Sequence, residues 1–350
     1  MPRVFHAAWL LVLLPACGRV GFSPEFFTCT PDGHARLCVD ETCTDMGPCP
    51  LGCDEAARVC HVASNSLSAL FEQPTANLDL SGAESPVVID ADSGEIRTPS
   101  RVLRAGGAGQ DAASGIGFAI VPQQGGPNLG VLTVESFFLP AGCALEVVGT
   151  NAFGLVSRGD LILEGVLDVG ARGMRAGPGG YDGGEPGSSG HGPCAGALGQ
   201  GSLVCPDLCA SGGGGAGGSF PGGDGGPVNW EPGPVFFDGA AGGGFCEASF
   251  EPIVGGSSGA GGAFPGDCDC SPGEGGGGGG AVQIVSATRV SIGAQGGIRA
   301  PGDGGGTTVN GGGAGGGAGG TILIETLAFS LADGGFLAAN GGGGGAGDCT

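Results

Sequence analysis

Residues 281–302 read AVQIVSATRVSIGAQGGIRAPG, and residues 321–341 read TILIETLAFSLADGGFLAANG. Each stretch contains three short runs in which apolar residues alternate with other residues, and small residues separate the runs. Alternation with a period of two indicates a β-strand with one buried face. The equivalent residues Ile284 and Ile324 are 40 positions apart, and the sequence between the two stretches is mostly glycine. The sequence therefore predicts two copies of a unit made of three strands and two corners.

The two copies align at six apolar positions, and a weaker copy precedes them. The aligned pairs are Val282 with Ile322, Ile284 with Ile324, Val290 with Phe329, Ile292 with Leu331, Ile298 with Phe336, and Ala300 with Ala338. The weaker copy has Phe153, Leu155, Leu161, Leu163, Leu167 and Val169 at these positions. One unit cannot bury its apolar side alone, so such units stack on one another. We therefore expect an all-β fold, a parallel β-solenoid similar to a β-helix, with these side chains in its core.

Short apolar runs also extend from Leu78 to Val148, with turn residues between them. Their spacing of roughly 8–12 residues is typical of an all-β domain. We interpret them as irregular first coils that cap one end of a solenoid over residues 79–350. A separate β-sandwich over residues 78–150 is the alternative interpretation.

Residues 170–280 form a long glycine-rich insertion in the expected solenoid. It carries an even set of cysteines, which are expected to form disulfides: Cys194, Cys205, Cys209, Cys246, Cys268 and Cys270. It also carries aromatic residues that we expect to be exposed: Phe220, Trp230, Phe236, Phe237, Phe245 and Phe264. Its glycine runs lack the strict period of collagen, so they are either packed segments similar to polyproline II or flexible loops. Trp230, Phe236 and Phe237 are the candidates for contacts with a glycan or another surface.

Residues 29–60 contain six cysteines among turn-forming residues and almost no apolar side chains. The cysteines are Cys29, Cys38, Cys43, Cys49, Cys53 and Cys60. So short a stretch cannot fold on burial alone, and three disulfides would order it, in any of about 15 pairings. Zinc is the alternative, because His34 and His61 lie nearby, but the usual Cys-x2-Cys spacing does not occur. Residues 61–78 are predicted to be an exposed linker with one helical turn around 69–71.

The N-terminus has the pattern of an export signal, with Arg3 followed by an apolar run over residues 4–14. The sequence Leu14-Pro15-Ala16-Cys17 resembles a bacterial lipobox. This resemblance implies a signal peptide over residues 1–16, a lipidated Cys17 and a tether over residues 17–28. Gly18 stands where an inner-membrane lipoprotein usually has aspartate, which implies the outer membrane or the cell surface. A soluble secreted protein, cut elsewhere, is the alternative.

The cysteine count agrees with lipidation of Cys17. The chain has 15 cysteines, and removing Cys17 leaves an even number that can all pair. Cys143 and Cys349 complete the set of disulfide candidates. Paired cysteines in such number are typical of exported proteins.

Composition excludes several functions. The formal net charge is −22, and all 12 basic residues are arginine. The acidity argues against nucleic acid as a partner, because such binding depends on neutralising phosphates. The absence of lysine excludes a P-loop lysine and a Schiff-base lysine.

No motif in the chain indicates catalysis, a cofactor or a metal. Residues 255–259 match the nucleophile elbow G-x-S-x-G, but no helix follows them. His191 lies near Cys194, Cys205 and Cys209, which we expect to form disulfides rather than to bind metal. Calcium is an alternative for the scattered aspartates, which are Asp224, Asp267, Asp269 and Asp303. The repeats contain few charged residues, which are Asp160, Glu164, Asp168, Arg289, Arg299, Glu325 and Asp333. They do not align between copies in the sequence, so no acid–base pair is indicated.

The repeats and glycine-rich corners resemble the glycine-rich β-solenoid domains of bacterial secreted and surface proteins. This resemblance covers about residues 80–350 and carries no catalytic residues. It implies a non-enzymatic surface lipoprotein with a structural or adhesive role, whose partner is the membrane. A module that binds a glycan or a surface protein is the second hypothesis, and a polysaccharide-active enzyme is the third.

Overall fold

The computed structural model describes residues 26–30, 33–39, 42–73, 75–201, 210–230, 235–246, 250–264, 271–308 and 311–347, with the backbone alone at 228–230 and 235–237. Its elements are strands, apart from one 3₁₀-helix, η1 (Leu67–Glu72). The predicted all-β class and the helical turn near residue 70 are therefore confirmed. The residues of the expected signal peptide, Cys17, Cys205, Cys209, Asp267, Cys268, Asp269, Cys270 and Cys349 lie outside the described residues.

Residues 129–338 contain four stacked layers of strands, two of which the sequence repeats predicted as full copies. The first layer is β12 (Leu129–Val134), β13 (Phe137–Leu139) and β14 (Ala144–Val148). The second is β15 (Ala152–Ser157), β16 (Leu161–Leu163) and β17 (Val166–Asp168). The third is β20 (Ala281–Ile292) with β21 (Gly297–Arg299), and the fourth is β22 (Thr321–Leu331) with β23 (Phe336–Ala338). Successive layers pair in parallel throughout.

The register of the layers follows the sequence alignment except at its last strand. Val282 lies opposite Ile322 and Val290 lies opposite Phe329, as predicted. Ile298, however, lies opposite Leu337, not Phe336, so the alignment of Ile298 and Ala300 was wrong by one residue. The physical reason is steric, because a Cβ atom at Gly297 would overlap the Phe336 ring, which occupies that space. The one-residue difference between the copies instead falls at the irregularity within β20 and β22.

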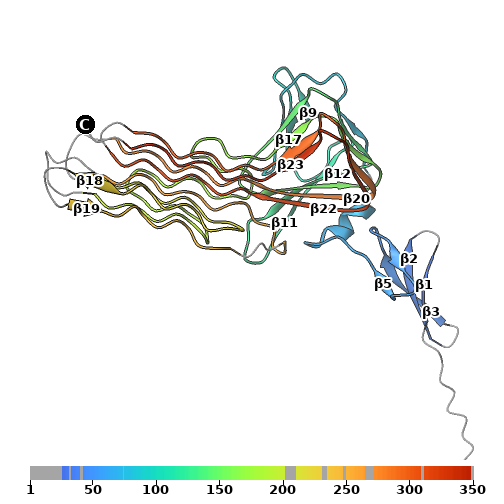
Figure 1. Cartoon of the computed structure of the whole chain (residues 1–350). Helices are drawn as coiled ribbons and strands as arrows, with labels where there is room; N and C mark the ends of the chain where they lie inside the picture. Colours follow the sequence, from blue (N-terminus) through green and yellow to red (C-terminus); the bar gives the residue numbers. More distant parts are fainter. Residues whose placement is uncertain are drawn as a thin grey trace, which may run out of the picture.

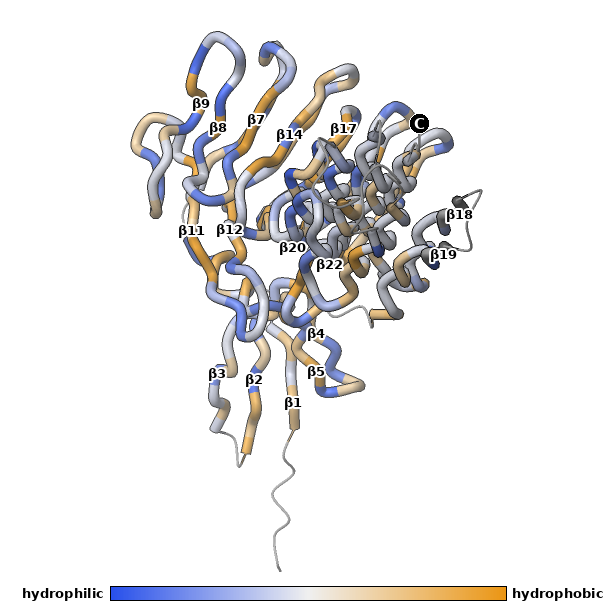
Figure 2. The backbone as a smooth tube through the Cα atoms, turned by 90° about the vertical axis from the view of Figure 1, so that its left-hand side faces the viewer, coloured by the Kyte–Doolittle hydropathy of each residue, from blue (hydrophilic) through white to orange (hydrophobic). Residues whose placement is uncertain are grey.

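The core lies between the two sheets that these strands build. One contiguous cluster contains the inward side chains of the first three layers, and Ile322 and Ile324 of the fourth layer are partly buried against it. Figure 2 shows hydrophobic stretches along β12 and β14 of the first layer and along two earlier strands, β7 (Val87–Asp90) and β11 (Gly117–Val121). Alternating apolar residues thus form the core because each strand buries every second side chain.

The strands before the first layer belong to the same two sheets. β6 (Leu78–Asp79) and β7 (Val87–Asp90) pair in parallel with β13 and β14. In one sheet, β8 (Ile96–Arg97) pairs with β7, and β9 (Val102–Arg104) pairs with β8. In the other sheet, β11 (Gly117–Val121) pairs with β12, and β10 (Gly109–Gln110) pairs with β11. All four of these pairs are antiparallel. This continuity excludes a separate β-sandwich over residues 78–150. These strands cover one end of the stack, as a cap should.

A buried arginine organises this cap. Arg104 is 1% exposed, and its guanidinium lies 5.5 Å from the Phe118 ring centroid. Its N–H groups donate five hydrogen bonds of 2.7–3.1 Å to the backbone carbonyls of Gly94, Ala105, Gly107, Gly109 and Ile116. Burial lowers the pKa of Arg104, although Asp111 opposes the shift. The five bonds offset the cost of enclosing a charge, since a buried charge requires partners for its donors.

The segment predicted as an exposed linker is instead packed against a sheet. Leu67, Leu70 and Phe71 of η1 are buried. They join Val131 and Val285, which face outward from the stack, in a second apolar cluster. The polar composition of residues 61–78 concealed this contact, because a few apolar side chains are enough to anchor a short segment.

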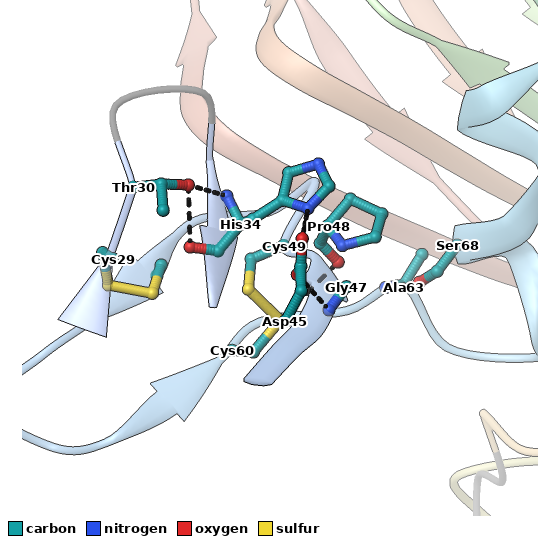
Figure 3. Close-up of a disulfide and its surroundings, with 11 residues drawn as sticks. Cys29, Thr30, His34, Asp45, Gly47, Pro48, Cys49, Cys60, Ala63 and Ser68 are labelled. Carbon is teal, nitrogen blue, oxygen red and sulfur yellow. Dashed lines mark hydrogen bonds and ion pairs between the residues drawn. A yellow bond between two sulfur atoms is a disulfide. The ribbon is translucent and has the colours of Figure 1, made fainter. Parts of the chain in front are cut away.

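The N-terminal module is a small disulfide-bonded unit, shown in Figure 3. β1 (Phe26–Cys29), β2 (His34–Val39) and β3 (Thr42–Pro48) form one antiparallel sheet, and β4 (Cys53–Asp54) pairs with β5 (Val59–Cys60). Disulfides join Cys29 to Cys53, Cys38 to Cys43, and Cys49 to Cys60. The pairing occupies all six cysteines, which leaves no thiolate for zinc. His34 Nδ1 instead lies 3.1 Å from the Asp45 carboxylate, and hydrogen bonds from Gly47 and His34 lower the pKa of Asp45.

The glycine-rich segments form a hydrogen-bonded bundle that runs away from the sheets (Figure 1). Successive N–H groups of residues 212–218 donate in turn to 220–226, 313–316 and 194–197, and every third N–H group returns to the same neighbour. A chain with three residues per turn, as in polyproline II, presents its N–H groups in this order. The bundle therefore has the packed arrangement, which was one of the two interpretations of the glycine runs.

Glycine is required in the bundle because the backbones approach closely. A Cβ atom on Gly213 would lie 2.6 Å from the Gly261 carbonyl oxygen and 2.7 Å from that of Ala260. The bundle also extends beyond the predicted insertion, since residues 302–308, 312–320 and 340–347 hydrogen-bond within it. A disulfide between Cys194 and Cys246 links two of its segments.

Candidate functional site

A groove with convergent polar groups lies where the bundle meets the sheets. We call it the junction groove; it encloses about 1090 Å³. The lining residues used below are Arg172, Arg175, Tyr181, Asp182, His191 and Glu274. Residues 147–150, at the end of β14 and just after it, form another part of its wall. A concave surface that combines polar groups with an aromatic ring is the usual form of a small-molecule site.

One side of the junction groove is held by ion pairs around Asp168. Arg172 lies 3.1 Å from the carboxylate of Glu146 and 3.3 Å from that of Asp168, which also accepts a 2.8 Å hydrogen bond from Arg299. The Asp168 side chain is 9% exposed. Burial alone would raise the pKa of Asp168, but hydrogen bonds from Arg299 and the Gly170 N–H, with the charge of Arg172, hold it below its ordinary value. These charges are satisfied by one another and serve to fix the groove wall.

The other side of the groove presents polar groups that can form further hydrogen bonds. Arg175 is exposed, and its guanidinium makes no hydrogen bond or ion pair within the described residues. His191 Nδ1 lies 2.9 Å from the carbonyl oxygen of Asp182, to which a protonated Nδ1 donates a hydrogen bond. The Asp182 carboxylate accepts a 2.8 Å hydrogen bond from the Ala176 N–H, which closes the turn that carries Tyr181.

The groove has the chemistry of a binding site. Its guanidinium, imidazole and carboxylate groups offer both donors and acceptors, and the half-buried Tyr181 offers an apolar ring face. Of its carboxylates, Glu146 is paired with Arg172 and Asp182 closes a turn, whereas the exposed Glu274 makes no side-chain hydrogen bond or ion pair within the described residues. The residues suit a ligand rich in hydroxyl groups.

The residues of the nucleophile-elbow match are structural. Ser257 and Ser258 are buried in the bundle. The Ser258 hydroxyl accepts a 2.7 Å hydrogen bond from the backbone N–H of His191, and the Ser257 hydroxyl accepts one of 3.1 Å from that of Cys194. Both hydroxyls therefore hold neighbouring segments together, and the His191 imidazole contacts neither of them in the hydrogen bonds described.

The metal and disulfide candidates are only partly within the described chain. Cys194 is bonded to Cys246 rather than available to a metal with His191. No group of three or more potential ligands gathers among the residues that the structure describes. Cys143, expected to form a disulfide, is a free thiol enclosed in the apolar core, and its burial raises its pKa. The expectation that every cysteine except Cys17 pairs is therefore wrong at Cys143.

The charged residues of the repeats do align across layers, contrary to the sequence analysis. Asp168 lies opposite Arg299 in the register of β17 and β21, and the two form the ion pair described above. Asp160 likewise pairs with Arg289 of the next layer. The sequence comparison missed these pairs because it looked for like residues in one column, whereas opposite charges stabilise adjacent strands.

The aromatic candidates occupy different parts of the bundle. Trp230 and Phe236 belong to the hairpin of β18 (Val228–Trp230) and β19 (Val235–Phe237), which lies at the end of the bundle farthest from the sheets (Figure 1). The side chains of Trp230, Phe236 and Phe237 are outside the described part. Phe220, Phe245 and Phe264 are exposed, as predicted. The sequence singled out the hairpin but gave no sign of the junction groove.

The chain matches no protein-family model, and neither a curated protein nor a solved structure is similar to it. Among the residues described, no helix has the length and hydropathy needed to cross a membrane. The four disulfides within those residues are typical of an oxidising environment.

Proposed function

We propose that the protein is a lipid-anchored surface protein of a bacterium, with a structural or adhesive role and no catalytic one. The observation that carries this proposal is the hydrogen-bonded glycine bundle. It places the hairpin of β18 and β19 far from the N-terminal module, which would face the membrane if Cys17 carries the lipid (Figure 1). A rigid projection of this kind is suited to holding a contact surface away from a cell.

We infer that the four layers form a β-solenoid. Parallel pairing of β15 with β20 and of β20 with β22 supports this, together with the equivalent pairing of β17, β21 and β23 in the second sheet. A solenoid supports the proposed role because each layer contacts only its neighbours, which gives an elongated and regular platform.

Anchoring is tested by fractionating cells that express the wild-type chain or the variant Cys17→Ser. We expect the wild-type protein in the membrane fraction, with added acyl mass, and the variant in the soluble fraction, because one cysteine would carry all the acyl chains. Cys143→Ser is the matched control, since Cys143 is enclosed in the core. A Cys17→Ser protein that remains in the membrane fraction contradicts the proposal.

The adhesive role is tested by replacing residues 228–237 with a short glycine turn. The neighbouring segments 220–226 and 240–243 hydrogen-bond to each other directly, so the bundle should remain folded. We expect cells with the shortened bundle to lose attachment to surfaces while keeping the protein on the cell. Unchanged attachment would show that the end of the bundle is not the contact surface.

Saccharide binding in the junction groove is the second candidate function, and the free guanidinium of Arg175 beside Tyr181 favours it. Planar charged groups hydrogen-bond to hydroxyls, and an aromatic face packs against the C–H face of a sugar ring. Titration with neutral oligosaccharides should give saturable binding that Tyr181→Ala abolishes and Arg175→Ala weakens. Arg101→Ala is the control, because it removes an exposed arginine of the distant cap. Equal affinities in all three variants would eliminate the groove as a site.

A further inference from the structure

The fourth layer leaves one end of the apolar core open. β22 pairs with β20 alone and β23 pairs with β21 alone, so both strands have a free edge within the described chain. The edge of β22 extends over 11 residues. Free strand edges of this length present unpaired N–H and C=O groups and readily pair with another chain.

The exposed residues at this end occupy core positions. Phe329, Leu331 and Leu337 are 48%, 46% and 43% exposed. Their counterparts in the third layer are Val290, Ile292 and Ile298, which are 0%, 2% and 0% exposed. The fourth layer therefore exposes the side chains that every earlier layer buries under the next one.

A hollow of about 530 Å³ lies between the two strands of the fourth layer. Ile322, Ile324, Phe329 and Leu337 line it, with Thr326, Ala338 and Ala339. The lining is apolar except for one threonine, so water in the hollow gains few hydrogen bonds. Contiguous exposed apolar surface of this kind marks a protein interaction site.

The opposite end of the stack cannot receive this surface. The cap of β8, β9, β10 and β11 lies there, and its side chains Ile96, Ile116 and Phe118 are buried. Arg104 holds five loop carbonyls of the cap in place. A second copy that stacked head to tail would have to displace this cap, whereas its own fourth layer offers an uncovered apolar surface of the same kind within the described residues.

The charges of the fourth layer suit contact with an identical surface. Where the third layer has Arg289 and Arg299, the fourth has Ala328 and Ala338. The carboxylate of Glu325 is already bound by the N–H of Ser64 and the side chain of Gln283. Two copies would therefore meet without opposing cations, and Asp333, in the turn after β22, is the remaining charge of the layer.

We propose that two copies of this chain associate end to end through β22 and β23, about a twofold axis. The β22 edges pair with each other, and Phe329, Leu331 and Leu337 of each copy cover those of the other. Such an interface uses the same surface on both copies and closes the assembly at a dimer, since the capped ends remain outside. The dimer carries two glycine bundles on one joined core.

Sedimentation of the full chain tests the proposal, with Cys17→Ser present so that no lipid contributes to association. We expect a dimer whose dissociation on dilution fits a single constant. Leu331→Arg places an unpaired charge in the interface and should raise that constant at least ~100-fold. Val102→Arg is the matched control, because Val102 is 56% exposed on the capped side and should leave the dimer unchanged. Circular dichroism verifies that both variants remain folded.

Hydrogen exchange of the β22 amides provides a second readout. In the proposed dimer, their protection falls as the protein is diluted and falls further in Leu331→Arg. A wild-type chain that is monomeric at every concentration overturns the proposal, as does a Leu331→Arg chain that still dimerises normally. A monomer whose β22 amides stay protected also overturns it, because another part of the same chain must then cover the edge.

Discussion

Replacing Gly213 with alanine should destabilise the glycine bundle, whereas replacing Gly223 with alanine should not. The new Cβ atom at position 213 would lie 2.6 Å from the Gly261 carbonyl oxygen and 2.7 Å from that of Ala260. Real Cβ atoms essentially never approach within 3.0 Å, and ordinary contact begins near 3.4 Å. The segment that contains Ala260 must therefore move by roughly 0.8 Å, the difference between 3.4 and 2.6 Å.

That movement weakens the hydrogen bonds that link three segments. They are the 2.9 Å bond from Gly213 to Gly313, the 3.1 Å bond from Ala260 to Gly214, and the 2.8 Å bond from Gly315 to Ala260. With a net contribution of about 1 kcal/mol for each bond, the loss is about 2–4 kcal/mol. At Gly223 a Cβ atom would meet nothing within 4 Å. That variant should gain about 0.4–1 kcal/mol, because alanine restricts the unfolded chain.

The two variants are compared by urea denaturation with the disulfides intact and by hydrogen exchange of the bundle amides. The expected free energies of unfolding change in opposite directions, and exchange should accelerate at residues 211–218 in the Gly213 variant alone. Both substitutions remove one glycine from the same bundle, so composition and helix propensity are matched. If the two variants had the same stability within about 0.5 kcal/mol, the close packing of the bundle would be refuted.

Three further changes test other parts of the structure. Arg104→Lys keeps the charge but supplies three donors for five carbonyls, so thermal denaturation should show a loss of about 2–5 kcal/mol and a frayed cap. Asp168 has a lowered pKa in the folded state, so its contribution is present above about pH 3.8 and is lost as the pH falls through the folded value. Asp168→Asn should therefore cost about 1–3 kcal/mol at neutral pH, and its difference from wild type should shrink in acid denaturation series. Replacing Cys194 and Cys246 with serine releases a loop of 52 residues and should cost about 4 kcal/mol, measured by denaturation against the oxidised wild type.

The repeat in the sequence was sufficient to predict two layers of the stack, in the correct register over β20 and β22 but not over β21 and β23. Val282 and Ile322 share a column because alternation marks the buried face of a strand, and the equal spacing marks the stacking. The sequence did not identify the first layer as a copy of the repeat. Its strands, β12 to β14, pair with those of the second layer in the same way as the later layers pair, but different turns separate them. The pairing of Ile298 with Leu337 was not visible in the pattern. The Phe336 ring fills the space beside Gly297, and the alternation of apolar residues does not indicate that a glycine will leave such a space.

The junction groove could not be predicted from the sequence. Its walls come from the end of β14, from the segment that carries Tyr181 and His191, and from Glu274, which are distant from one another in sequence. Arg104 was equally hidden, because its five partners are backbone carbonyls, and every residue type has one.

By itself, the sequence determined the all-β class, the parallel stack and the cysteine-rich module, because alternation, spacing and cysteine count are local properties of the chain. Only the tertiary structure decided that the glycine runs pack into a bundle, that Asp160 and Asp168 pair with arginines of the next layer, and that Cys143 stays free. The physical reason is that these features depend on which backbones lie side by side. Glycine has no side chain whose type could indicate which backbone packs beside it. A buried thiol or an ion pair is defined by distances between residues far apart in the chain.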